Sequence, residues 1–298
     1  MGVVYEAVRD DIGIRAAVKV LRPEFARNME ISTRFFNEAR AVNIIDHPNV
    51  VAISDFGTSA AGAPYIVMEY LEGDSLRQRL ARSGKLAPEA AMRIGKQVAL
   101  GLVAAHSKQV VHRDLKPVNI LLIVEHEGSE RAKILDFGIA KLSADPASVA
   151  LTGVGVSLGT PAYMSPEQCK SARAADDKSD VYSLGIILYE MLSSDIPFDA
   201  ETDAELLSMH MFKSPPPLQK RAPGTSAALA AIVHRMLAKE PAERPSAAEV
   251  ATELAALQSG QVSGSAIAPV AAGKHRSISD TETLNEGAAL PAPAGKRA

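Results

Sequence analysis

The chain has 298 residues, of which 47% are hydrophobic, and its formal net charge is −3. This length and hydrophobic content suffice for a sizeable core, so we expect a globular protein of one large domain or two ordinary ones. The near-neutral charge provides no bulk basic field, which argues against nucleic acid as a partner. The only cysteine, Cys169, excludes an internal disulfide and a cysteine-based zinc site, as expected for a cytoplasmic protein.

The first seventy residues alternate between short strands and one helix. Periodicity predicts strands over residues 1–9, 14–21, 50–57 and 65–70, and a helix over residues 28–44. Phe35, Phe36, Ala39, Val42 and Asn43 are predicted to lie on or beside one face of this helix.

A helical region follows. Asp74 is expected to cap the start of a helix, and Pro88 to open a longer helix over residues 88–107. The buried face of the longer helix is predicted to consist of Ala91, Ile94, Val98, Leu102 and Ala105.

The second half of the chain is predicted to contain a hairpin and further helices. The hairpin strands are expected over residues 120–124 and 132–135. Beyond residue 258 the composition shifts to Gly, Ser, Ala and Pro without periodicity, which predicts a disordered tail over residues 258–298. Helices are expected over residues 180–192, 204–211 and 227–237.

Two motifs indicate the chemistry, HRDLKPVN at residues 112–119 and DFG at residues 136–138. Asp114 is a carboxylate that can accept a proton from a hydroxyl group. Asn119 and Asp136 carry oxygen ligands of the kind that Mg²⁺ prefers. A base, two metal ligands and the nearby cation Lys116 suit phosphoryl transfer, in which a protein mainly positions the reactants and offsets charge.

At these motifs the chain resembles the eukaryotic-type protein kinases, and in its later segments it is most similar to their bacterial serine/threonine branch. The resemblance covers residues 2 to about 257 and implies an α+β fold with two lobes. The smaller lobe, residues 1–70, would hold an antiparallel sheet and one helix. The larger lobe, residues 71–257, would be mainly helical.

The resemblance also implies a nucleotide site for ATP. Gly2 and Val4 match the last Gly and the Val of the Gly-rich loop, whose first strand and first two glycines have no counterpart here, so the kinase domain looks N-terminally incomplete. Lys19 would hold the α- and β-phosphates and pair with Glu38, and Ala17 would lie beside the nucleotide. The linker between the lobes would bind adenine through the backbone of Glu69 and Leu71, with Met68 behind it.

For catalysis, the resemblance implies that Asp114 accepts the proton of a Ser or Thr hydroxyl of a protein substrate. The acceptor would be Ser or Thr and not Tyr, because a lysine two residues after Asp114 is the serine/threonine form of the loop. Lys116 would offset charge on the γ-phosphate. Asn119 and Asp136 would bind two Mg²⁺ ions, and Phe137 would pack against the helix that carries Glu38.

The activation segment, residues 139–167, is expected to be phosphorylated by the kinase itself, with a homodimer as a possible arrangement for the reaction in trans. The candidate sites are Thr152, then Ser157 and Ser148, and Arg113 would bind the phosphate. Thr160 is expected to hydrogen-bond near Asp114 and Lys116 instead of carrying phosphate.

Two structural contacts are also implied by the resemblance. Glu167 is expected to form a buried ion pair with Arg244, and Asp180 to hold the backbone of the catalytic loop.

Two alternatives remain at this stage. A catalytically impaired scaffold of the same fold would explain the incomplete Gly-rich loop, and a small-molecule phosphotransferase of related fold is a weaker possibility.

No run of about 18 uncharged apolar residues is present, so no membrane segment is expected in this chain, although a full-length parent could be membrane-anchored.

Overall fold

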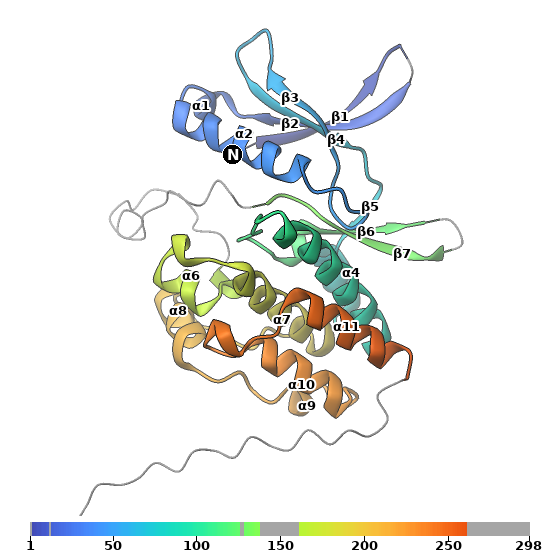
Figure 1. Ribbon diagram of the computed structural model, residues 1–298, viewed down its shortest axis with the longest axis vertical. Helices are drawn as coiled ribbons and strands as arrows, with labels where there is room; N and C mark the ends of the chain where they lie inside the picture. The colour runs from blue at the N-terminus through green and yellow to red at the C-terminus, as the bar shows by residue number, and fades with distance from the viewer. Residues whose placement is uncertain (1, 12, 126–127, 138–160, 261–298) are drawn as a thin grey trace, which may run out of the picture. The chain divides into compact units, whose positions relative to one another are not determined.

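The computed structural model describes residues 2–11, 13–125, 128–137 and 161–260 (Figure 1). The chain divides into two compact units, Met1–Val262 and Ser263–Ala298, and the described residues all belong to the first. The expected phosphorylation sites Thr152, Ser157 and Ser148, together with Thr160 and nearly all of the expected tail, lie outside the described residues.

The N-terminal part is a four-stranded antiparallel sheet in the order β1-β2-β4-β3 (Figure 1). Its strands are β1 (Gly2–Arg9), β2 (Ile14–Leu21), β3 (Ile53–Thr58) and β4 (Pro64–Glu69). The expected strand over residues 50–57 therefore begins too early. Val50 instead forms a parallel bridge to Ile134, because its buried side chain joins the core of the C-terminal part.

Two helices accompany this sheet, the short α1 (Pro23–Ala26) and α2 (Met29–Asn43). The side chain of Asn28 caps α2 by accepting hydrogen bonds from two backbone N–H groups. Of the residues predicted to lie on or beside one face of α2, Phe35, Ala39 and Val42 are buried, and Asn43 at the C-terminal end of the helix is exposed. Leu21, Ile66, Phe35 and Ala39 form a small core between α2 and the sheet.

A second sheet of three antiparallel strands follows, formed by β5 (Gly73–Ser75), β6 (Ile120–Val124) and β7 (Glu130–Ile134). The expected helix cap at Asp74 is wrong. Ser75 caps α3 (Leu76–Ser83) in a reciprocal capping box with Gln78. Asp74 lies in β5, where its carboxylate binds Arg82 at 2.8 Å.

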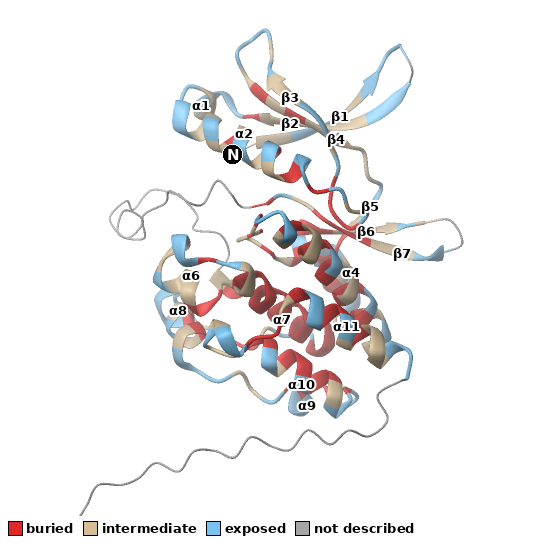
Figure 2. Cartoon of the chain, viewed as in Figure 1, coloured by how far each residue is buried: buried red, intermediate tan, exposed pale blue. Residues whose placement is uncertain are grey.

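The C-terminal part is helical around α7 (Asp177–Ser193), which is buried along almost its whole length (Figure 2). It begins three residues before the expected position because Asp176 caps it through the N–H of Ser179. The predicted buried face of α4 (Pro88–Ser107) is confirmed at all five positions. The surrounding helices are α6 (Pro166–Lys170), α8 (Asp203–Phe212), α9 (Leu218–Arg221), α10 (Ala227–Met236) and α11 (Ala247–Gln258). Among the described residues, 3₁₀ turns lie at Pro117–Asn119, Pro161–Tyr163, Ala172–Ala174 and Pro241–Glu243.

Within the described ranges, none of the helices combines the length and the apolar character needed to cross a bilayer.

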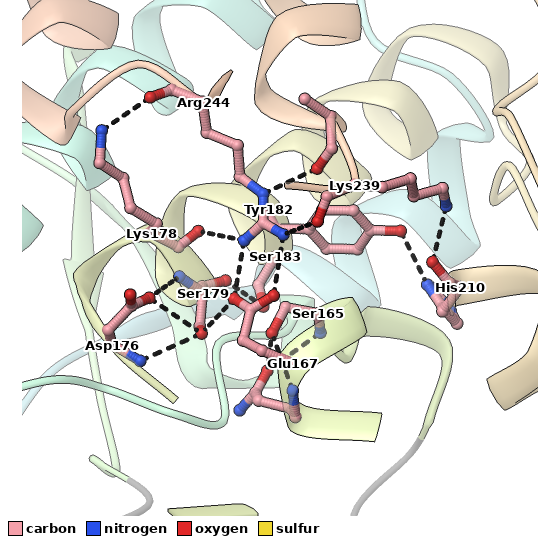
Figure 3. Close-up of polar contacts among 12 residues, drawn as sticks. Ser165, Glu167, Asp176, Lys178, Ser179, Tyr182, Ser183, His210, Lys239 and Arg244 are labelled. Carbon is pink, nitrogen blue, oxygen red and sulfur yellow. Dashed lines mark hydrogen bonds and ion pairs between the residues drawn. The ribbon is translucent and has the colours of Figure 1, made fainter. Parts of the chain in front are cut away.

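An ion pair between the buried Arg244 and the largely buried Glu167 joins α6 to the segment before α11 (Figure 3). Both terminal nitrogens of Arg244 donate to Glu167, at 2.7 and 2.8 Å, and the arginine also donates to three backbone carbonyls. Ser179 donates its hydroxyl to Glu167 at 2.5 Å. Burial works against the charge of Glu167, but these hydrogen bonds outweigh it and lower the pKa of the carboxyl group. The structure thus contains the expected pair.

A buried histidine lies beside this network. His210 of α8 has no exposed surface, and its Nδ1 lies 3.0 Å from the hydroxyl of Tyr182 (Figure 3). Lys239 donates to the backbone carbonyl of His210 at 2.7 Å. Burial lowers the pKa of His210 to about 4, and the positive charge of Lys239 acts in the same direction. His210 is therefore neutral at physiological pH.

We predict that Arg244→Met lowers the free energy of unfolding by about 3 kcal/mol, because Glu167 would be left as a largely buried charge without its arginine partner. Urea unfolding monitored by circular dichroism measures this loss. The matched control is Arg235→Met, which removes an arginine that pairs with Glu253 at a partly exposed site and should cost less than about 1 kcal/mol. Equal losses in the two variants would contradict the prediction.

We also predict a pH-dependent contribution from His210. Its folded-state pKa lies below the unfolded value near 6.5, so its stabilising contribution is complete above pH 6.5 and is lost as the pH falls toward 4. The loss should reach about 3 kcal/mol at most, at 1.36 kcal/mol per pKa unit. His210→Asn keeps an acceptor near Tyr182 and does not titrate, so its unfolding free energy should fall less between pH 6.5 and 4.5. Parallel pH profiles for the two proteins would refute this role.

Candidate active site

The loop between α4 and β6 carries Asp114 and Lys116. The Lys116 ammonium lies 3.0 Å from the Asp114 carboxylate, and both side chains are about one-fifth exposed. A carboxylate with an adjacent cation, both within reach of solvent, can accept a proton and offset negative charge on the same reacting group.

Asp180, in the first turn of α7, holds this loop in place. Its carboxylate accepts hydrogen bonds from the backbone N–H groups of His112 and Arg113, each at 2.8 Å, and lies 2.8 Å from Nε2 of His106. Asp180 is 1% exposed. Arg113 has a positive φ of 65°, a conformation that is unfavourable for a side-chain-bearing residue and needs such external support.

His112 connects the loop to the segment that carries Asp136. Its Nε2 lies 2.9 Å from the carbonyl oxygen of Leu135, which can only accept, so Nε2 carries the proton. Nδ1 then accepts from the N–H of Asp114 at 3.2 Å. The ring also packs on Phe137, with 4.6 Å between centroids. Burial lowers the pKa of His112, which favours this neutral state.

Asn119 and Asp136 lie at the same end of the β6–β7 hairpin. Ile120 pairs with Ile134, and the N–H of Leu135 donates to the carbonyl of Asn119 at 2.8 Å. The amide nitrogen of Asn119 donates to the carbonyl of Asp114 at 2.9 Å, which orients the amide oxygen as a possible ligand. One amide oxygen and one carboxylate fit Mg²⁺, which usually takes one or two protein ligands and completes its shell with phosphates and water.

Lys19 of β2 reaches both Glu38 of α2 and Asp136. Its ammonium lies 3.3 Å from Glu38 and 2.8 Å from Asp136. Burial works against the charge of Lys19, but the two carboxylates outweigh it and raise the pKa of the amine. The expected pair with Glu38 is present, and the contact with Asp136 joins the N-terminal sheet to the segment after β7.

The face of the sheet that carries Lys19 also carries other expected nucleotide-site residues. Val4 pairs with Lys19 and Ala17 pairs with Met68, and directly paired residues lie on the same face. Val4 is 57% exposed. A Cβ atom on Gly2 would lie 3.0 Å from the carbonyl oxygen of Val20, so a larger residue would crowd the strand next to Lys19.

Phe137 and Met68 close the inner end of this site. They line a cavity of about 20 Å³ together with Lys19, Glu38, Val42, Val51, Ile53, Ile66 and Asp136. Phe137 is fully buried and belongs to the same core cluster as Val42 of α2, as expected from its predicted packing against that helix.

The linker after β4 only partly matches the expectation. The N–H of Glu69 donates to the carbonyl of Ala52 at 3.0 Å, so it already has a hydrogen-bond partner within the protein. Of the two backbone groups of Glu69, the carbonyl is therefore the candidate for a hydrogen bond to adenine. The Glu69 carboxylate accepts from Lys133 at 2.5 Å and from the N–H of Ala52 at 2.7 Å. Leu71 packs against the main core.

A groove adjoins the loop that carries Asp114. It has a volume of about 440 Å³, and its walls come from the loop, the Ala162–Tyr163 turn and the C-terminal end of α7. Glu190, which lines the groove, accepts a hydrogen bond from the hydroxyl of Tyr163 at 2.7 Å. The groove is lined by Arg77, Lys116, Pro117, Val118, Ala162, Tyr163, Glu190, Ser194, Asp195, Ile196 and Asp199.

Sequence reasoning missed three residues that support the site: His106, Lys133 and Gln168. Gln168 donates to the carbonyl of Arg113 at 2.9 Å. Each of the three contacts a residue at least 50 positions away in sequence, and no local pattern distinguishes it from an ordinary polar residue of its element.

Comparison with known proteins agrees with this geometry. The chain is 41% identical over 262 residues to the serine/threonine-protein kinase pkn2 of Myxococcus xanthus, covering 87% of this chain and 31% of the relative. It is 39% identical over 249 residues to the serine/threonine-protein kinase PknB of Mycobacterium leprae, covering 82% of this chain and 39% of the relative. The chain thus spans less than half the length of these relatives.

A solved structure has the same fold. The crystal structure of a double mutant of the Mycobacterium tuberculosis PknI kinase domain aligns with a TM-score of 0.66 and 26% identity. The alignment covers 87% of this chain and 91% of that one, so the expected two-lobed kinase fold is confirmed. The family described as protein kinase domain matches residues 1–254. The chain therefore belongs to the protein kinase domain family.

Proposed function

We propose that this chain is a serine/threonine protein kinase domain that transfers the γ-phosphate of ATP to Ser or Thr hydroxyls of proteins. The observation that carries the proposal is the joint fixation of two segments by His112, which binds the Asp114 N–H through one ring nitrogen and the Leu135 carbonyl through the other. This bridge holds the candidate base and the candidate metal ligand Asp136 in a fixed relation.

In the proposed reaction Asp114 accepts the proton of the incoming hydroxyl, and Lys116 offsets negative charge on the phosphoryl group being transferred. Lys19 binds the α- and β-phosphates. In the structure its ammonium contacts Asp136 at 2.8 Å, so phosphate binding replaces one carboxylate partner while Glu38 keeps the side chain directed into the site. Val4 and Ala17 cover the nucleotide base, and Gly2 leaves room beside Lys19.

Mg²⁺ would be held by Asn119 and Asp136, and when bound it neutralises charge on the phosphates. The donor set supports this assignment, because one amide and one carboxylate oxygen at the same end of the hairpin suit an ion that also binds phosphates. The kinase family uses ATP and a divalent metal, and these two residues are the ones we assign to the metal in this chain.

The groove of about 440 Å³ beside Lys116 supports a protein as the second substrate, because it offers an extended surface next to the candidate base. We assign residues 1–70 to the smaller lobe, 71–257 to the larger lobe and 258–298 to a tail. A cytoplasmic location and a homodimer that phosphorylates itself in trans complete the proposal.

Autophosphorylation of the activation segment is supported by the surroundings of Arg113. Its Nε is buried and has no hydrogen-bond partner within the part of the chain that the structure describes, and burial lowers the pKa of the guanidinium. A phosphate supplies both a negative charge and acceptor oxygens for such a group. We place the phosphate on Thr152, with Ser157 and Ser148 as secondary sites.

We predict that Asp114→Asn reduces incorporation of phosphate from γ-labelled ATP at least about 100-fold, because the amide cannot accept the hydroxyl proton. Incubation of the purified chain with Mg²⁺ and labelled ATP, with itself and a generic basic protein as acceptors, measures this. The control is Asp74→Asn, which changes a carboxylate of β5 that pairs with Arg82 at the surface and should leave incorporation unchanged.

The scaffold alternative makes the opposite prediction. If the unaltered chain binds ATP but incorporates no label, even when upstream residues encoded in frame are added, the chain is a scaffold and the proposed transfer is wrong.

We predict that mass spectrometry of the chain after incubation with ATP finds phosphate on Thr152 first, because a phosphate on the activation segment can bind Arg113. Thr152→Ala should then shift phosphate to Ser157 or Ser148, or abolish it. A segment without phosphate in a preparation that labels the basic protein would overturn autophosphorylation while leaving the kinase activity intact.

A further inference from the structure

An exposed cluster of side chains links the β1–β2 hairpin to the linker after β4. Arg15 of β2 donates from Nε to Glu6 of β1 at 2.8 Å and from Nη1 to Glu72 of the linker at 2.5 Å. Its guanidinium carbon also lies 3.8 Å from the ring centroid of Tyr70. One side chain thus contacts three residues, two of them in the linker.

The sheet register places this cluster at the rim of the proposed nucleotide site. Lys19, Ala17 and Arg15 alternate along β2 and therefore lie on one face, the face from which Lys19 reaches Glu38 and Asp136. Ala17 pairs with Met68, which lines the inner cavity. Arg15 is the next residue of that face toward the hairpin turn, so it lies outward of Ala17, where the linker leaves β4.

The contacts of Arg15 hold two segments that a nucleotide base would lie between. Glu6 pairs with Ala17 and so belongs to the same face of the hairpin, whereas Tyr70 and Glu72 belong to the linker proposed to bind adenine. Because the guanidinium binds both at once, it resists movement of the hairpin away from the linker. Holding the hairpin against the linker should therefore favour a nucleotide base bound between them.

We propose that Arg15, Tyr70 and Glu72 form a clamp at the mouth of the nucleotide site and that this clamp strengthens nucleotide binding. The proposal rests on the nucleotide site assigned above. Arg15 is a positioning residue, since it acts through the hairpin and contacts no reacting group. The clamp consists of ion pairs and the stacking of the Arg15 guanidinium on Tyr70, and all its members are accessible to solvent. Salt should therefore weaken the ion pairs, and removal of the clamp should leave the buried core unchanged.

The test measures the dissociation constant of unlabelled ADP with Mg²⁺ by calorimetry. Arg15→Ala should weaken binding about 3- to 10-fold, the range for one stacked cation combined with exposed ion pairs. Glu72→Ala should weaken it less, and the double variant should bind no more weakly than Arg15→Ala alone. At high salt the difference in affinity between the unaltered chain and Arg15→Ala should shrink, because salt screens the exposed ion pairs.

Arg9→Ala is the matched control. Arg9 lies on the same hairpin and forms an exposed ion pair with Asp11 beside the turn, so its loss removes a comparable surface contact that does not involve Tyr70 or Glu72. Arg9→Ala should leave ADP binding unchanged, and both variants should melt within about 2 °C of the unaltered chain, as expected for surface substitutions.

The outcomes separate the two proposals. Normal ADP binding by the unaltered chain with equal affinity in Arg15→Ala would overturn the clamp and leave the nucleotide site standing. Equal weakening in Arg9→Ala would also overturn it, because the effect would then belong to the hairpin as a whole. Failure of the unaltered chain to bind ADP would overturn the nucleotide site and the clamp together.

Discussion

The carboxylate of Asp180 is buried at the start of α7 and accepts hydrogen bonds from the backbone N–H groups of His112 and Arg113. A helix N-terminus favours a negative charge, so this carboxylate is stabilised both by its donors and by α7. The two bonds fix an otherwise unfavourable backbone conformation at Arg113. Since Asp114 follows directly, the direction of the candidate base depends on a residue of α7, a helix that is buried along most of its length.

A chain of contacts connects Asp180 to the rest of the site. The side chain of His112 contacts the Leu135–Phe137 segment, and Asp136 of that segment pairs with Lys19 of the N-terminal sheet. The C-terminal part thus holds the catalytic loop through buried hydrogen bonds. The sheet contributes Lys19, and a phosphate can replace one of the carboxylates that Lys19 pairs with. Arg244 and Glu167 fasten α6 to the same helical frame, close to the Gln168 contact that holds the Arg113 carbonyl.

Much of this arrangement was predictable because each motif combines a local pattern with a chemical role. The pairs Lys19–Glu38 and Glu167–Arg244, and the contact of Asp180 with the loop, were expected from the family resemblance and are present. Predictions were wrong where a residue could belong to either of two neighbouring elements, as with Asp74, which was expected to cap a helix. The short strand β5 includes Asp74 because it pairs with Leu122, and only the fold brings that partner near. The Arg15 cluster likewise depends on the register between β2 and β4, which periodicity alone does not fix.

The most direct measurement is a crystal structure of the chain with Mg²⁺ and a non-hydrolysable ATP analogue. We expect the Lys19 ammonium to leave Asp136 for the phosphates while keeping Glu38, and oxygens of Asn119 and Asp136 to lie about 2.0–2.1 Å from Mg²⁺. A nucleotide bound elsewhere, with the Lys19–Asp136 pair intact and no metal at Asn119, would contradict the assignment of these residues to phosphoryl transfer.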